Sequence, residues 1–347
     1  MIEIGDFMPN NGNSKIKFLV LLKTLKKYSD EEHPLSAAEL CKLIQKEGIE
    51  AERKSICRDI AVLMRHGTDI IYTRFPKQGY FIAKRDFELP EVRLLLDAVS
   101  TAPFITNKKT AELTGKLCEL LSCYQAEKVI KQIYIENRVK FENEQIYYTI
   151  DTINRAISEH KQIAFFYHHR VIVNQRSQFD EGREFAISPY ALLWVNDKYY
   201  LAGNYDKYDK ISNFRLDRMK QVELTSTDSR PFSEVSSYQE YFDTSDYLKK
   251  SFNMYNGEQE MIALRCSNEL LDTIVDKFGN EIDFTCHDAN AFTVRASVYV
   301  SEGLIDWLLQ YGDRVTVLSP KSLKEVMTAR VEEMCAAYHI KQETGAL

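Results

Sequence analysis

Apolar residues recur at helical spacing three times near the start of the chain. The three stripes predict helices over 16–28, from Ser36 to Gly48, and over 53–65. Ser36 and Glu39 have the spacing of a capping box, in which two side chains satisfy unpaired N–H groups at a helix start. Gly48 suits the left-handed residue that ends a helix, so the second helix is predicted with both of its ends.

The third predicted helix has two chemically different faces. Its apolar face comprises Ile56, Ile60, Leu63 and Met64. At about 100° per residue, the opposite face comprises Lys54, Arg58, Ala61 and Arg65. Such a helix can pack on two others and present a cationic surface to a partner.

Two β-favouring runs follow this basic helix and enclose a turn. Residues 70–75 and 80–83 flank the turn 76–79, which predicts a β-hairpin. Three helices and a hairpin in this order predict a winged helix-turn-helix over 15–85, with the hairpin as its wing. The polar residues 1–14 predict a flexible lead-in.

The rest of the chain changes character three times. Helical periodicity over 86–161 predicts a helical connector, and five short aromatic-rich strands over 162–230 predict a small closed β-barrel. Residues 231–256 read as a linker with one short helix, and 257–340 follow the β-α-β-β-α-β order of a ferredoxin-like domain. The predicted fold class is therefore multidomain α+β.

Charge is distributed unevenly along these 347 residues. The net charge is −6, but residues 15–85 hold 15 Lys and Arg against 9 Asp and Glu, a local balance of +6. A basic end on an acidic body predicts a polyanion partner, and charge alone does not distinguish nucleic acid from lipid.

Several classes of protein are disfavoured by what the sequence lacks. No apolar run is long enough for a membrane span and no signal peptide follows Met1, so we expect a cytoplasmic protein with no membrane partner. The seven cysteines form no CxxC pair, which favours reduced thiols. The motifs GxSxG, GxGxxG, HExxH and the P-loop are absent, so we expect no enzyme, no catalytic residue, no cofactor and no metal.

The basic helix and the wing supply the candidate contacts to double-stranded DNA. Arg and Lys side chains reach phosphates and guanine edges when a helix lies in the major groove. The predicted DNA-binding residues are Arg53, Lys54, Ser55 and Arg58 on the helix, with Arg74 and Lys77 on the wing. In the alternative interpretation, this face is only a solvated surface and the helices bind protein.

Two groups of motifs resemble known families. Ser55-Ile-Cys-Arg58-Asp59-Ile60, with Leu63, Gly67 and Gln78-Gly79-Tyr80, resembles the winged helix of DeoR-type regulators. Ser188 to Trp194, Lys198 to Leu201 and Asn213 to Arg218 resemble the WYL domain, and the α+β tail resembles the WYL C-terminal extension. Tyr199 replaces the tryptophan of the WYL motif and keeps an aromatic ring there.

The WYL resemblance implies an Sm-like, SH3-type β-barrel that binds an anionic effector, either nucleic acid or a nucleotide-like molecule, in a homodimer. Carried over to this chain, the ligand-binding candidates are Tyr167, Ser188, Tyr200, Arg215 and Arg218. Arginines beside tyrosines could bind phosphate and stack on bases. Alternatively, the tyrosines belong to the core and the arginines pair with Asp217 or Asp206.

Two hypotheses for function follow. In the first, the chain is a DNA-binding transcription regulator whose WYL domain responds to the anionic effector. In the second, it is a non-enzymatic WYL binding module that regulates a protein or RNA partner, with the helix-turn-helix as a dimerisation surface.

Overall fold

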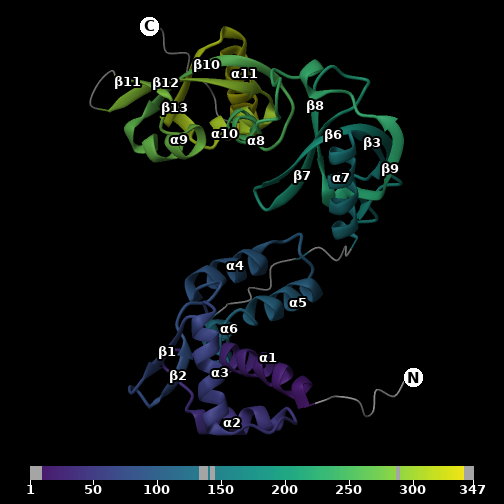
Figure 1. The fold of residues 1–347 in the computed structure, drawn as a ribbon. Coiled ribbons are helices and arrows are strands. Elements are labelled where there is room, and N and C mark those ends of the chain that lie inside the picture. The colour runs from purple at the N-terminus through teal and green to yellow at the C-terminus, as the bar shows by residue number, and fades with distance from the viewer. Residues whose placement is uncertain (1–9, 133–139, 141–144, 287–289, 340–347) are drawn as a thin grey trace. The chain divides into compact units, whose positions relative to one another are not determined.

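The computed structural model describes residues 10–132, 140, 145–286 and 290–339. The chain divides into two compact units, 1–142 and 143–347 (Figure 1). Each unit has its own apolar cores. Part of the predicted lead-in, residues 1–9, lies outside the described residues, whereas residues 10–14 belong to the first helix. Among the helices that are described, none is long and apolar enough to cross a bilayer.

The first unit begins with three helices and a hairpin, in the predicted order. They are α1 (Asn10–Tyr28), α2 (Ala37–Lys46), α3 (Arg53–Arg65), β1 (Ile70–Thr73) and β2 (Gly79–Ile82). The predicted capping box is confirmed, because the Ser36 hydroxyl accepts from the N–H of Glu39 and the Glu39 carboxylate accepts from the N–H of Ser36. Gly48 follows α2 with φ +78°, as the helix end requires.

The apolar faces of the three helices meet in one core. Its most buried residues include Leu21, Leu25, Leu40, Ile44, Ile56 and Ile60. The predicted apolar face of α3 is wrong at Met64, which is 48% exposed. Met64 lies about 80° around the helix from Ile56 at 100° per residue, so it falls at the margin of the buried face.

The hairpin β1–β2, here called the wing, is attached to the chain before α2. Leu35 and Tyr80 exchange two backbone hydrogen bonds of 2.8 Å each, so the segment before α2 is joined to the wing by an isolated β-bridge. A Cβ at Gly79 would lie 2.6 Å from the backbone carbon of Leu35. Glycine is therefore required for this close approach.

Three further helices complete the described part of the first unit. They are α4 (Leu89–Thr101), α5 (Asn107–Cys118) and α6 (Cys123–Gln132). A separate small core of Val92, Leu96, Leu121, Ala126 and Val129 holds them together. Helices were predicted at each of these positions.

The second unit opens with α7 (Ile146–Glu159), which packs on a five-stranded antiparallel sheet. Its strands are β3 (Lys161–Tyr167), β6 (Arg183–Val195), β7 (Lys198–Asn204), β8 (Ile211–Arg215) and β9 (Met219–Asp228). Their order is β8-β7-β6-β3-β9, and all five were predicted as strands.

The predicted closed barrel is wrong for the described strands. The edge strands β8 and β9 do not pair with each other, so the sheet stays open. The three-residue turn Leu216–Arg218 connects them directly, and it brings the two edges together at one end only. The backbone N–H of Arg215 there donates to the hydroxyl of Tyr167 at 3.2 Å instead of to a β9 carbonyl. The result is a curled sheet.

A second hairpin in this region was not predicted. Strands β4 (Arg170–Val173) and β5 (Arg176–Phe179) pair only with each other, and all of their residues are exposed except Phe179. Its turn, Asn174-Gln175, has positive φ at both residues. The Asn-Gly dipeptide that is typical of such turns is absent there, so the sequence did not indicate a turn.

The segment predicted as a linker is packed against the sheet. It contains one short helix, α8 (Thr244–Lys250), in agreement with the prediction. Val235, Tyr238, Tyr247 and Met254 are buried with Leu193, Ala202 and Ile211 of the sheet. Of the interspersed aromatics of this polar stretch, Tyr238 and Tyr247 are therefore core residues, whereas Tyr241 and Tyr255 are exposed.

The last part of the chain alternates strands and helices as predicted. It comprises β10 (Glu258–Ser267), α9 (Leu271–Phe278), β11 (Asp283–Cys286), β12 (Ala291–Val300), α10 (Glu302–Leu309), β13 (Val315–Ser319) and α11 (Lys321–Ala337). The sheet order is β11-β12-β10-β13, and every neighbouring pair is antiparallel.

Candidate nucleic-acid interface

The outer face of α3 is exposed and basic. Arg53, Lys54, Arg58 and Arg65 are all exposed, together with the small Ala61 between them. The Arg58 Nε donates to the Lys54 carbonyl oxygen at 3.4 Å, so this side chain lies back along its own helix. Among the described residues, none of these four cations forms an ion pair, and all four charges remain available to an anionic partner.

Ser55 lies differently from the other predicted helix contacts. It is half-buried, and its hydroxyl accepts a hydrogen bond from the Lys17 Nζ of α1. Lys17 also pairs with Asp59 at 2.9 Å, so it neutralises the acidic residue of α3. Ser55 and Asp59 therefore join α3 to α1 through Lys17.

The two predicted wing residues also differ in whether another residue of the protein binds them. Arg74 is exposed at the tip, and among the described residues it has no charged partner. Lys77 is held by Glu39 of α2, with 2.7 Å between its Nζ and the carboxylate oxygen. A phosphate would have to compete with Glu39 for Lys77.

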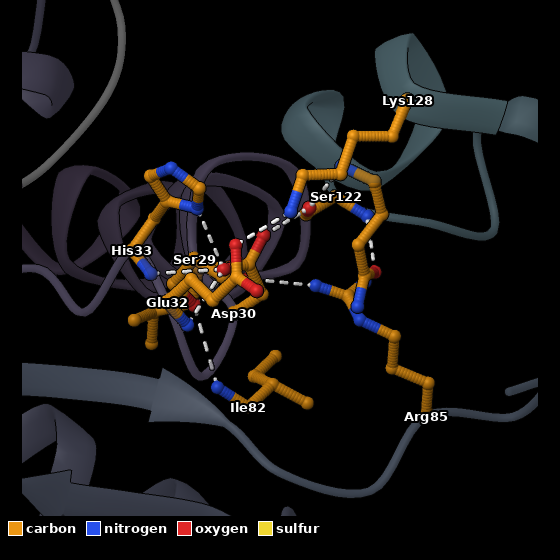
Figure 2. Close-up of polar contacts among 10 residues, drawn as sticks. Ser29, Asp30, Glu32, His33, Ile82, Arg85, Ser122 and Lys128 are labelled. Carbon is orange, nitrogen blue, oxygen red and sulfur yellow. Dashed lines mark hydrogen bonds and ion pairs between the residues drawn. The ribbon is translucent and has the colours of Figure 1, made fainter. Parts of the chain in front are cut away.

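A buried polar cluster connects this part of the unit to α6, as Figure 2 shows. Asp30, between α1 and α2, accepts hydrogen bonds at one carboxylate oxygen from the N–H groups of Glu32 and His33 and contacts the His33 ring at 2.8 Å. Its other oxygen accepts from the hydroxyl of Ser122, immediately before α6. Burial raises the pKa of Asp30, but the hydrogen bonds from Ser122 and His33 outweigh it and hold the pKa below its ordinary value.

Arg85 reinforces the same cluster from the segment after the wing. Its guanidinium donates to the carbonyl oxygens of Ser29 at 2.6 Å and Lys26 at 2.8 Å. The Ser29 hydroxyl in turn accepts from the N–H of Ile82 in β2. The end of α1, the wing and α6 are therefore tied at one place, which sequence reasoning missed because no short motif links Asp30 to Ser122.

Three of the five ligand-binding candidates are buried or bonded to other residues of the protein. Ser188 is fully buried, and its hydroxyl interacts with the Gln162 side chain and the N–H of Arg230. Tyr167 is buried among Phe165, Phe185 and Phe214. Arg215 makes two hydrogen bonds to Asp217, of 3.0 and 2.7 Å. For these residues the structure favours the alternative of core tyrosine and paired arginine.

The other two candidates, Tyr200 and Arg218, remain accessible. Both are half-exposed, and Tyr200 lies opposite Arg215 across the β7–β8 pair. Burial raises the pKa of Tyr200, against the opposing charge of Arg215, so its hydroxyl stays protonated at neutral pH. Arg218 forms no ion pair among the described residues.

Further cations surround this end of the sheet. Arg170 and Lys220 lie over the ring of Phe179, at 4.8 and 5.3 Å from its centroid, and Arg183 lies 5.5 Å from that of Phe185. With Arg218, these residues are here called the cationic rim: Arg170, Arg183, Arg218 and Lys220. Of these four residues, only Arg218 was predicted from the sequence as a ligand-binding candidate, and the hairpin that presents Phe179 was not predicted.

Comparison with protein families identifies two domains in the second unit. The family model of the WYL domain matches residues 148–224, and that of the WCX domain matches residues 258–335. The first match begins inside α7, earlier than the predicted domain start at 162. Neither match reaches the first unit, so the resemblance to DeoR-type regulators stays a prediction.

Solved structures with some similarity are distant. Proteasome accessory factor B/C (PafBC) of Arthrobacter aurescens is 15% identical, with a TM-score of 0.28, over 93% of this chain and 49% of that one. This chain thus spans about half the length of PafBC. A CRISPR Cas-related protein is 16% identical, with a TM-score of 0.37, over 99% of this chain and 89% of that one. No curated protein matches the chain.

The expectation of a WYL domain is therefore confirmed by a family match that runs from inside α7 into β9. The segment after the packed linker is likewise matched to a named domain. The chain carries a WYL domain followed by a WCX domain, C-terminal to a unit of helices with a β-hairpin.

Proposed function

We propose that this chain is a DNA-binding transcription regulator that responds to an anionic effector. The exposed basic face of α3 beside the wing carries the proposal. Its apolar side packs against α1 and α2, so the cations are held on a rigid helix of a size that the major groove accepts. Arg53, Lys54 and Arg58 would contact phosphates and base edges, and Arg74 would contact the flanking backbone.

The experiment is a titration of the chain with duplex DNA at several salt concentrations. Each phosphate contact should contribute about 0.9 to the slope of log affinity against log salt. The double variant Arg53→Ala, Arg58→Ala should lower affinity by about tenfold or more and reduce that slope. The proposed homodimer would appear in the same titration as two chains per duplex.

The control variant removes two charges elsewhere in the same unit. Lys116→Ala with Lys131→Ala changes exposed residues of α5 and α6, and its affinity should stay close to that of the wild type. If the Arg53, Arg58 variant binds as tightly as the control, the α3 face is not the interface. Binding of RNA in place of DNA would favour the second hypothesis, a WYL module that regulates an RNA partner.

For the effector, the proposal rests on the cationic rim and Tyr200. Arg170, Arg183 and Lys220 lie over aromatic rings, and together with Arg218 and Tyr200 they can combine phosphate binding with base stacking. Single-stranded nucleic acid and nucleotides share this chemistry. Arg218, which is not committed to an internal ion pair among the described residues, would make the central contact.

A further inference from the structure

The wing tip presents one apolar side chain fully to solvent. Phe75 is 84% exposed, more than any other large apolar residue of the described chain. It lies between the predicted DNA contacts Arg74 and Lys77. A single exposed apolar residue is common on protein surfaces, so its place between two predicted DNA contacts, and not its exposure alone, is what suggests a partner.

The tip holds Phe75 in place without covering it. The hydroxyl of Thr73 donates to the carbonyl oxygen of Phe75 at 2.7 Å and accepts from the N–H of Phe75 at 3.1 Å. Below the tip, the Gln78 side chain donates to the hydroxyl of Tyr72, and the rings of Tyr72 and Tyr80 lie 4.9 Å apart. The backbone at the tip is therefore fixed while the ring projects from it.

The charges around Phe75 indicate the kind of partner. Arg74 is exposed next to it, and the Glu39 carboxylate, which contacts the wing through Lys77, is neutralised by that pair. A partner must therefore combine negative charge with an apolar surface behind it. Duplex DNA does so, because stacked bases lie between two rows of phosphates.

We propose that Phe75 is an apolar wedge that inserts between base pairs in the minor groove beside the α3 site and bends the duplex. The inference rests on the proposed DNA-binding function and adds a residue that would set specificity through DNA shape. Apolar wedges of this kind kink DNA by about 20–90°, at a cost that depends on the base step. Flexible pyrimidine–purine steps should therefore be preferred at the wing position.

The test uses a short duplex that the wild-type chain selects from a randomised pool, labelled at both ends for energy transfer. The wild type should shorten the end-to-end distance on binding. Phe75→Ala should abolish the shortening and lower affinity about tenfold, whereas Phe75→Leu should keep most of both, because leucine can also act as a wedge. Phe87→Ala, at another exposed phenylalanine of the same unit, is the control and should match the wild type.

The outcomes separate this inference from the proposed function. If Phe75→Ala binds and bends the duplex like the wild type, while the Arg53, Arg58 variant has lost affinity, the wedge is wrong and DNA binding stands. If the wild type selects no duplex, the DNA-binding function fails and the wedge fails with it. Melting followed by circular dichroism should be the same for Phe75→Ala and the wild type, because the side chain packs against nothing.

Discussion

Glu39 uses both of its carboxylate oxygens. One accepts from the N–H of Ser36 at 2.8 Å and caps α2, and the other accepts from Lys77 of the wing at 2.7 Å. Burial raises the pKa of Glu39, but hydrogen bonds from Lys77 and Ser36 outweigh it and lower the pKa to about 2. One side chain therefore orients the wing relative to the helix before α3.

This pKa predicts a dependence of stability on pH. Because the folded-state pKa is depressed, the contribution of Glu39 is present above about pH 4.5 and is lost as pH falls toward about 2. Glu39→Gln keeps a capping side chain but not the ion pair, so its unfolding free energy should fall less over that range. Denaturant unfolding at several pH values measures the difference.

The Lys77–Glu39 pair should contribute little to the free energy of unfolding at neutral pH. The Lys77 and Glu39 side chains are 49% and 42% exposed, so solvent screens the pair and we expect about 0.2–1 kcal/mol. Equal acid sensitivity of the wild type and Glu39→Gln would show that Lys77 does not stabilise the Glu39 carboxylate.

Single residues also show where prediction from sequence ends. The exposed cations of α3 could be predicted, because helical periodicity fixes which face is buried. The role of Ser188 could not, since its partner Arg230 lies 42 residues away, and for Arg215 the sequence offered pairing with Asp217 only as one of two alternatives. Sequence gives the residue types of a site, but hydrogen bonding decides which groups remain free.

Among the elements, α6 is joined to the end of α1 by a buried contact. Asp30 and Ser122 are 6% and 0% exposed, and the hydrogen bond between them bridges residues 92 positions apart. Hydrogen bonds to buried charges contribute about 1.5–3 kcal/mol. This contact therefore holds α6 against the end of α1, in the unit that carries the proposed DNA-binding face.

We predict that weakening this contact loosens α6 locally. Asp30→Asn removes the charge but leaves the Ser122 hydroxyl that accepts from the N–H of Gln125, so the start of α6 keeps its cap. Amide hydrogen exchange of α6 should accelerate in this variant. The matched control is Glu32→Gln, which removes only the exposed pair with Lys128. Unchanged exchange of α6 in Asp30→Asn would contradict the role of the contact.

Elements with their own end signals were predictable, and those defined by pairing were not. The capping box and Gly48 marked α2, and α3 was predicted over its observed range. The β4–β5 hairpin and the open edge between β8 and β9 depend on backbone turns that the residue types in the sequence do not predict. Closure of a sheet is a property of distant strands, which local periodicity does not report.

At the scale of the whole molecule, the proposed effector site and the proposed DNA site lie in different units. Arg218→Ala should lower the affinity for a short single-stranded oligonucleotide about tenfold, because a charge-assisted phosphate contact is lost. Its affinity for duplex DNA without the oligonucleotide should persist. Calorimetry measures the first quantity and the salt titration the second.

The choice of variant matters for this prediction. Arg215→Ala would leave the Asp217 carboxylate, whose side chain is 9% exposed, without its ion-pair partner. This variant would therefore disturb the fold as well as the site. Arg155→Ala, at an exposed residue of α7, removes one charge as a control. If Arg218→Ala and Arg155→Ala bind the oligonucleotide equally, the effector site lies elsewhere.

The close approach of Gly79 to Leu35 constrains how such a protein can diverge. Any other residue at 79 would push apart the backbone that carries the wing, whereas Arg74 and Phe75 support no part of the core. Sequence drift can therefore alter the tip without loss of the fold. A glycine with no functional group stays fixed, and the residues proposed to read DNA are free to acquire new targets.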